Sequence, residues 1–137
     1  MELPKELRLL AEACRDSGKI DDGLTALNEA LILIEEQENR RDEVAVRQVK
    51  GELLLLGGQA ASAEAEQCFR KAIEVARNQS AKWWELRATT SLARLLASQG
   101  RRDEARTMLA EIYGWFTEGF DTAGLKDAKR LLDELAM

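Results

Sequence analysis

The sequence predicts an all-α protein built from repeated helical hairpins, and three observations carry this prediction. The 137 residues include one proline and are 45% hydrophobic and 33% charged, with few β-branched residues beside many of the good helix formers. Apolar residues recur every three to four positions, as they do on the buried face of a helix. The glycines Gly18, Gly58 and Gly100 lie 40 and 42 residues apart, where helices are expected to end. A chain of this length is expected to form one domain.

The first hairpin is expected over about residues 4–38. Its first helix starts at Pro4, because a missing N–H is tolerated in the first turn, and ends at Gly18. The side chains expected on its buried stripe are Leu7, Leu10, Ala11 and Cys14. Its second helix is expected to begin near Asp21, a good N-cap. The side chains expected to point inward from it are Leu24, Leu27, Leu31 and Ile34. The mixed-charge stretch 35–43 is interpreted as a solvated connection.

The second hairpin is expected over about residues 42–78. Its first helix runs from Asp42 to Leu56 and stops at Gly57 and Gly58. The stripe expected to pack comprises Val46, Val49, Leu53 and Leu56, widened by Leu54 and Leu55. Ser62 is predicted to cap the second helix. The inner face of that helix is predicted to comprise Ala65, Phe69, Ala72, Ile73 and Ala76.

The third hairpin is expected over about residues 81–118, followed by a capping helix over about 123–136. Ser80 is predicted to cap the first of these helices, and a turn at 100–102 joins it to the next. Tyr113 and Phe116 are expected to receive the capping helix. The apolar stripe of the capping helix comprises Leu125, Ala128, Leu131, Leu132 and Leu135.

The three hairpins share a pattern of small and large residues. Gly23, Ala65 and Ala105 are small residues that lie 42 and 40 positions apart in the second helices. Large apolar residues follow four positions later, and a further set follows three positions after those: Leu27, Phe69 and Leu109, then Ala30, Ala72 and Ile112. This agreement predicts an internal repeat of three hairpins with a closing helix.

The small–large–small spacing after a glycine turn resembles the tetratricopeptide repeat. The resemblance implies a right-handed α-α superhelix, although the repeat here is longer than usual. The stretches GELLLLGG, AEAEQCFRKAIEVAR, ELRATTSLARLLASQGRRDEAR and YGWFTEGFDTAGLKDAKRLLDEL further resemble the C-terminal repeat region of bacterial multidomain predicted ATPases. In that family the region follows a nucleotide-binding domain, often with an adenylate/guanylate cyclase or a DNA-binding domain in front.

This chain lacks the GxxxxGK[ST] phosphate-binding loop, so neither ATP hydrolysis nor cyclase activity carries over from that family. Two alternatives stay open. The chain is either a segment of a larger protein of that family or a stand-alone copy of the regulatory end of such a protein. The chain has no histidine, which excludes Ser–His and Cys–His catalysis and histidine-based metal sites. We therefore expect no enzymatic activity, no cofactor and no metal.

Composition also limits the partners. The net charge of −5 and pI of about 5.0 speak against nucleic acid and anionic lipid, and the small basic spot at Arg101, Arg102 and Arg106 is interpreted as a solvated turn. No apolar run is long enough to cross a membrane, and the N-terminus lacks a signal-peptide pattern. Cys14 and Cys68 are expected to be buried thiols in a cytoplasmic protein.

The resemblance implies that the first helix of each pair lines a concave groove. Aligning these helices on their terminal glycines predicts eight groove residues: Arg8, Glu12, Arg15, Gln48, Glu52, Arg87, Thr90 and Arg94. Carboxylates of a bound segment could pair with the arginines of this set. The alternative is that these side chains form merely solvated faces. Trp83 and Trp84 are adjacent, so both cannot point inward, and an exposed tryptophan often marks an interface.

The function expected is therefore that of a non-catalytic protein-interaction module. Its partner would be a protein or peptide segment, or an attached upstream ATPase or cyclase domain. The alternative is a small-molecule-sensing domain that signals to such an attached domain. The run Leu31–Ile34 carries more apolar surface than one face can bury, so a homodimer is also expected.

Overall fold

The computed structural model describes residues 4–37, 40, 42–58 and 61–136. These residues contain seven helices and no strand, which confirms the predicted all-α class. The helices are α1 (Pro4–Ser17), α2 (Ile20–Gln37), α3 (Glu43–Leu56), α4 (Ser62–Asn78), α5 (Lys82–Ser98), α6 (Arg102–Tyr113) and α7 (Ala123–Leu135). Residue 38 of the first expected hairpin lies outside the described residues. Within these residues, no helix is long and apolar enough to cross a membrane.

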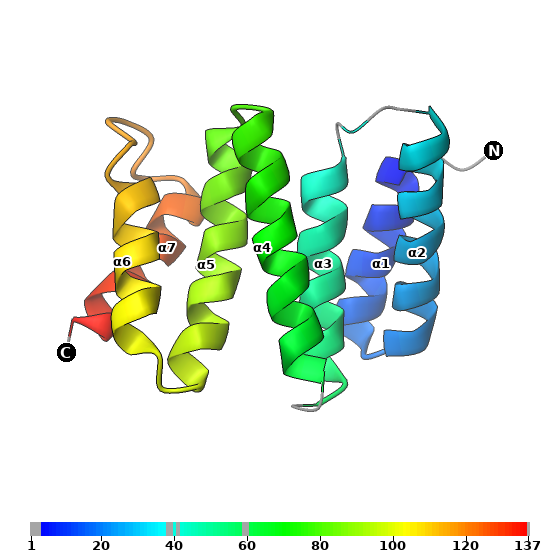
Figure 1. The fold of residues 1–137 in the computed structure, drawn as a ribbon, viewed down its shortest axis with the longest axis horizontal. Coiled ribbons are helices and arrows are strands. Elements are labelled where there is room, and N and C mark those ends of the chain that lie inside the picture. Colours follow the sequence, from blue (N-terminus) through cyan, green and yellow to red (C-terminus); the bar gives the residue numbers. More distant parts are fainter. Residues whose placement is uncertain (1–3, 38–39, 41, 59–60, 137) are drawn as a thin grey trace.

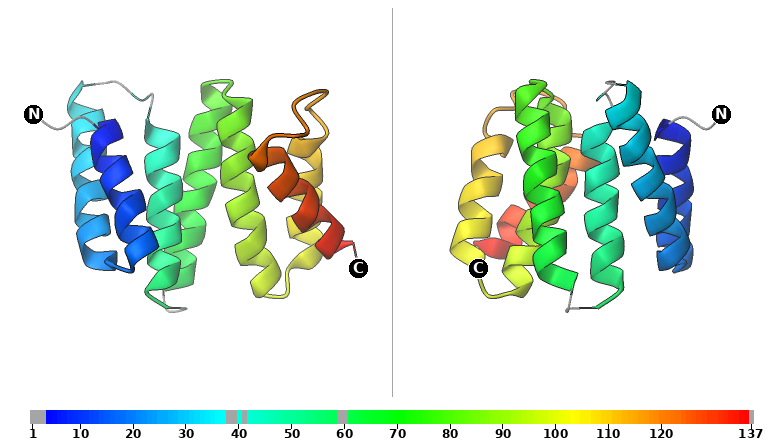
Figure 2. Two further views of the ribbon diagram at one scale, coloured as in Figure 1. Left: turned by 180° about the vertical axis from the view of Figure 1, so that it is seen from behind. Right: turned by 45° about the vertical axis from the view of Figure 1, so that its right-hand side comes forward.

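The helices form three packed pairs with α7 added at one end (Figure 1). α1 packs against α2, α3 against α4, and α5 against α6, while α7 packs against both α5 and α6. The pairs stand side by side in sequence order, so the two chain ends lie at opposite ends of the array. The odd-numbered helices also contact one another, α1 with α3, α3 with α5, and α5 with α7. Seen from behind, α1 and α7 lie in front of the array (Figure 2).

The glycines that define the repeat each end a helix. Gly18, Gly58 and Gly100 have φ values of +79°, +117° and +80°, a backbone conformation that side chains with a Cβ rarely adopt. After Gly18 and Gly100, the next residue donates its N–H back across the helix end, from Lys19 to Cys14 and from Arg101 to Leu96. This bond satisfies a carbonyl of the last turn and reverses the chain.

Two predicted helix caps are wrong. Ser62 is the first residue of α4 and Ala61 holds the cap position, while Ala81 holds it before α5. Ser80 instead has a positive φ of +55°, and Ala81 N–H donates to the Ala76 carbonyl at 2.8 Å. Ser80 therefore ends α4 in the way that a glycine ends α1 and α5. α2 begins at Ile20, one residue before the predicted Asp21.

The apolar core consists of two clusters of buried side chains. The smaller cluster joins α1, α2 and α3, and the larger joins α3 to α7. The predicted inner faces of α4 and α7 are buried, apart from the half-buried Leu132. The small residues Gly23, Ala65 and Ala105 are buried as the repeat predicts, and Cys14 and Cys68 are buried free thiols.

Two leucines predicted to be buried are exposed. Leu10 is 51% exposed because α1 packs only against α2 and α3, and the Leu7–Ala11–Cys14 stripe supplies that contact. Leu56 is 53% exposed because it lies in the last turn of α3, beside the connection to α4. Leu24 and Leu31, also predicted to point inward, are half-buried against the smaller cluster.

Candidate functional site

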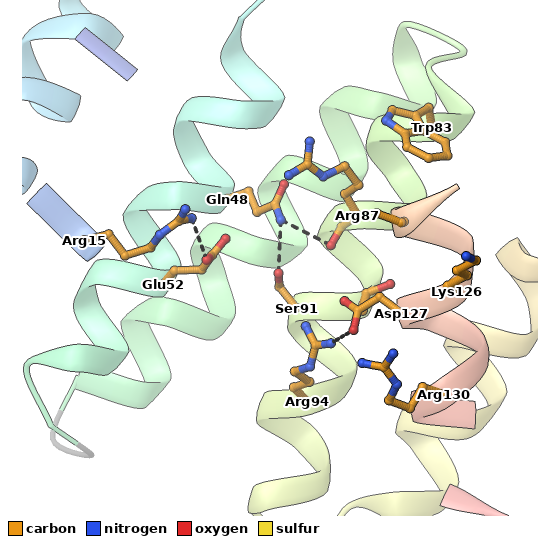
Figure 3. A pocket seen from close by; sticks show the side chains of 13 residues that line it. Arg15, Gln48, Glu52, Trp83, Arg87, Ser91, Arg94, Lys126, Asp127 and Arg130 are labelled. Carbon is orange, nitrogen blue, oxygen red and sulfur yellow. Dashed lines mark hydrogen bonds and ion pairs between the residues drawn. The ribbon is translucent and has the colours of Figure 1, made fainter. Parts of the chain in front are cut away.

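An open groove of about 710 Å³ runs over the odd-numbered helices (Figure 3). α1 and α3 contribute Arg15, Gln48 and Glu52. α5 contributes Trp83, Arg87, Thr90, Ser91 and Arg94, and α7 contributes Ala123, Gly124, Lys126, Asp127 and Arg130. The helices reach one surface because α1, α3, α5 and α7 contact one another in that order.

Six of the eight predicted groove residues line this groove. Arg8 and Glu12, the other two, pair with each other on α1, with Arg8 Nη1 at 3.3 Å from both carboxylate oxygens of Glu12. The Arg8 guanidinium also lies 5.9 Å from the centre of the Trp84 ring. The six side chains share one face of the array, and the groove begins one turn beyond Glu12 on α1.

Two of these six predicted residues make hydrogen bonds within the protein, so their polar groups are not free to bind a ligand. Gln48 Nε2 donates to Ser91 Oγ at 3.1 Å and to the Arg87 carbonyl at 3.4 Å, which joins α3 to α5. The Thr90 hydroxyl donates to the Leu86 carbonyl within α5 at 2.8 Å. Both side chains are buried, so we assign them to the floor of the groove.

Arg15 and Glu52 form an ion pair between α1 and α3, with Arg15 Nη1 at 2.8 Å from Glu52 Oε2. Burial raises the pKa of the Glu52 carboxyl, and the attraction of Arg15 only partly offsets this. Burial acts to lower the pKa of Arg15, but the nearby Glu52 and Asp16 carboxylates outweigh it and the pKa is raised. The pair therefore keeps one end of the groove close to electrically neutral.

α7, which the sequence predicts only as a capping helix, also lines the groove. Arg94 of α5 donates a hydrogen bond to Asp127 of α7, and this ion pair joins the two helices beside the groove (Figure 3). Lys126 and Arg130 make no ion pair with the residues that the structure describes. α7 contacts α5 as α5 contacts α3, so it takes the place of the first helix of a further pair. If α7 is treated as the first helix of a fourth pair, Lys126 and Arg130, which lie four residues apart on one helix face, are predicted as groove residues.

The groove is positively charged although the chain is acidic. Its lining holds five cationic side chains, Arg15, Arg87, Arg94, Lys126 and Arg130, and two carboxylates, Glu52 and Asp127, which leaves a net charge of +3. The whole chain has a net charge of −5. A concentration of one sign of charge in a hollow attracts ligands of the opposite sign.

The two adjacent tryptophans lie in different surroundings. Trp84 packs against the larger core cluster, and the guanidinium groups of Arg8 and Arg87 lie 5.9 and 5.2 Å from its ring centre. Trp83 is 37% exposed and lines the groove. A Cβ on Gly124 of α7 would lie 2.8 Å from Trp83 Cη2, so the indole ring rests directly on the backbone of α7.

No group of three or more potential metal ligands occurs among the described residues. A scan against protein-family models found no match for the chain, and a search of the curated proteins found none either. The geometry of the groove therefore carries the functional argument.

Proposed function

We propose that the chain is a non-catalytic interaction module that binds an acidic segment of a protein in the groove over α1, α3, α5 and α7. The observation that carries the proposal is a groove of net charge +3 on a chain of net charge −5. Arg87, Lys126 and Arg130 form no ion pair with the described residues, although the charge of Arg87 acts to lower the pKa of the nearby Glu52, so all three cations can bind a ligand. Guanidinium groups bind carboxylates through paired hydrogen bonds.

We also propose that the stacked pairs form a tetratricopeptide-like, right-handed superhelix. The backbones of the odd-numbered helices approach one another in series, whereas those of α2, α4 and α6 do not within the described residues, and α4 and α6 are joined through the long side chains of Arg70 and Glu104. Closer packing on the odd-numbered side supports an array that curves toward the groove. A curved array of this kind offers an extended concave surface to a ligand.

The small-molecule alternative receives less support. A pocket for a small molecule is usually enclosed and mostly apolar, with few polar groups. This groove is open, and five cations and two carboxylates line it. The same charge would suit an acidic stretch of an attached ATPase or cyclase domain. The free buried thiols Cys14 and Cys68 fit a protein of the reducing cytoplasm.

The proposal is tested with fluorescent peptides and a pair of charge-reversal variants. The probe is a Glu- and Ser-containing 12-residue peptide, and its Lys- and Ser-containing counterpart is the charge control. Lys126→Glu/Arg130→Glu reverses two groove cations. Lys19→Glu/Arg106→Glu makes the same charge change at exposed sites outside the groove and is the matched control.

We expect the acidic peptide to bind the native chain and the control variant, with binding that weakens as salt is added. We expect the groove variant to lose at least tenfold in affinity, about 1.4 kcal/mol. Binding of both peptides alike, or equal losses in the two variants, would refute the groove as an acidic-segment site.

A further inference from the structure

Three aromatic side chains, of which two are exposed, adjoin one end of the charged groove. Trp83, in the first turn of α5, lines the groove, and its ring centre lies 6.4 Å from that of Phe116 in an edge-on arrangement. Trp115 lies 5.2 Å from Phe116, also edge-on, and is 57% exposed. We call Trp83, Phe116 and Trp115 the aromatic platform.

The platform is held in place from two sides. The Trp83 ring rests on the α7 backbone at Gly124, where a side chain would have to displace it. Lys82 Nζ lies 5.8 Å from the centre of the Trp115 ring, a distance at which the cation and the ring attract each other. Trp83 and Trp115 make these contacts without a ligand, and such contacts lower the entropic cost of using the rings as a contact surface.

Cations continue from the platform along the groove. Arg87 and Arg94 follow Trp83 on α5, and at 1.5 Å per residue they lie about 6 and 16 Å farther along the helix axis. On α7, Lys126 and Arg130 follow Gly124 beside them (Figure 3). The groove thus presents an apolar end followed by a charged stretch.

We propose that the bound segment carries one apolar anchor side chain, which packs on the aromatic platform, followed by acidic residues that pair with Arg87, Lys126 and Arg130. This inference rests on the proposed function and specifies its ligand. Arg130 lies six residues beyond Gly124, about 9 Å farther along α7. An extended chain advances about 3.3 Å per residue, so the acidic residues that pair with Arg87 and Arg130 are expected about two and three positions from the anchor. Apolar and charged contacts together would set the direction and register of the segment.

The test compares acidic peptides that differ only in the anchor. One peptide carries Leu at the anchor position with Glu two and three positions later, a second carries the same residues in reverse order, and a third carries Ser in place of Leu. We expect the Leu to strengthen binding about tenfold over Ser in one of the two directions, the gain expected from burying one aliphatic side chain.

Three variants locate the anchor site. Trp83→Ala and Trp115→Ala are expected to abolish most of the gain from Leu while leaving the affinity for the Ser peptide within about twofold. Phe120→Ala is the matched control, because Phe120 is exposed in the same connection as Trp115, but its ring packs on Tyr113 and not on a ring of the platform. It is expected to keep the full gain. If Trp83→Ala disturbs the packing of α7, the result with Trp115→Ala decides whether the aromatic platform is the anchor site.

The possible failures are distinguishable. If the Ser peptide binds and loses affinity in Lys126→Glu/Arg130→Glu, but Leu adds nothing, the anchor is refuted and the proposed function stands. The anchor is also refuted if the Leu gain survives both tryptophan variants. If none of the peptides binds the native chain, the proposed function and the anchor fail together.

Discussion

At the scale of single residues, buried carboxylates join the repeats. Glu43 is fully buried at the start of α3, and Arg40 and Arg47 each donate to it at 2.7 Å. Glu85, 42 positions later in α5, is also buried and accepts a hydrogen bond from Arg77 at 3.1 Å. The interpretation of 35–43 as only a solvated connection is wrong at Glu43, because a buried ion pair forms there.

Replacing Glu43 with Gln should destabilise the fold. The variant loses two charge-assisted hydrogen bonds, and such bonds contribute about 1.5–3 kcal/mol. Burial acts to raise the pKa of Glu43, but the bonds from Arg47 and Arg40 outweigh it and the pKa is lowered. The carboxylate therefore stabilises the fold above its unfolded pKa, and this stabilisation is lost as the pH falls through its folded value.

Urea unfolding at several pH values checks this expectation. The difference between native and Glu43→Gln chains should be largest near neutral pH and should shrink in acid. Glu36→Gln removes an exposed carboxylate of α2 and is the control. A Glu43→Gln chain as stable as the native one at pH 7 would contradict the role of the pair.

Glu52 should show the opposite dependence on pH. Because burial raises its folded pKa, its contribution to stability is present below the unfolded pKa and is lost as the pH rises through the folded value. Relative to the native chain, Glu52→Gln should therefore gain stability as the pH rises from 4 to 7. Urea unfolding measures this difference in stability. A Glu52→Gln chain that is less stable relative to the native chain at pH 7 than at pH 4 would show that the ion pair with Arg15 outweighs the cost of burying the Glu52 charge.

At the scale of helices, close approach depends on small residues. Ala105 of α6 is fully buried in the larger cluster, in a helix that packs on α5. Gly51 of α3 allows a close approach of α3 and α4 in the second pair, because a Cβ at this position would lie 2.5 Å from the Phe69 ring. The small residues compared in the second helices include the first of these sites but not the second, although Gly51 has small, buried counterparts at the repeat spacing, Ala11 40 positions before it and Ala93 42 positions after it.

Replacing Ala105 with Trp should separate α5 from α6. Overpacking of a full core costs about 1–3 kcal/mol, and a residue as large as Trp is expected at or above the upper limit. Ala110→Trp on the exposed face of the same helix is the control and should change stability little. Equal thermal unfolding midpoints for the two variants would show that the repeat alignment is wrong.

Deleting residues 123–137 should cause aggregation. α7 buries Leu125, Ala128, Leu131 and Leu135 against α5 and α6, so its removal exposes the end of the larger core together with Tyr113 and Phe116. Size-exclusion chromatography and binding of a hydrophobic dye measure this. A soluble, monomeric and fully helical truncated chain would refute the capping role of α7.

At the scale of the whole molecule, the two ends of the array differ. α7 covers one end, whereas the α1–α2 pair at the other end exposes Leu9, Leu10 and Ile32. Ile32 belongs to the run from which self-association was predicted, and it is 58% exposed. The homodimer stays a prediction, and the exposed residues identify the surface on which to test it.

Sedimentation at micromolar concentrations provides that test. We expect a dimer of the native chain and a monomer of Ile32→Glu, because a charge in an apolar contact prevents association. Thr25→Glu, on the same helix at an exposed polar site, is the control and should stay dimeric. A monomer of the native chain at all concentrations removes the prediction.

Periodicity alone determined the number of helices, their approximate ends and most of their buried faces, because a packed helix must repeat its apolar residues every 3.6 positions. Terminal glycines set the expected rotational phase of each first helix, and six of the eight side chains chosen from it line one groove. Only the tertiary structure decided which polar groups on that face are free. Gln48 and Thr90 are occupied by neighbours, Arg94 is paired with Asp127, and Lys126 and Arg130 are available. The pairings of Gln48 and Arg94 join positions 33 to 43 residues apart, and no local pattern in a chain records how distant helices meet.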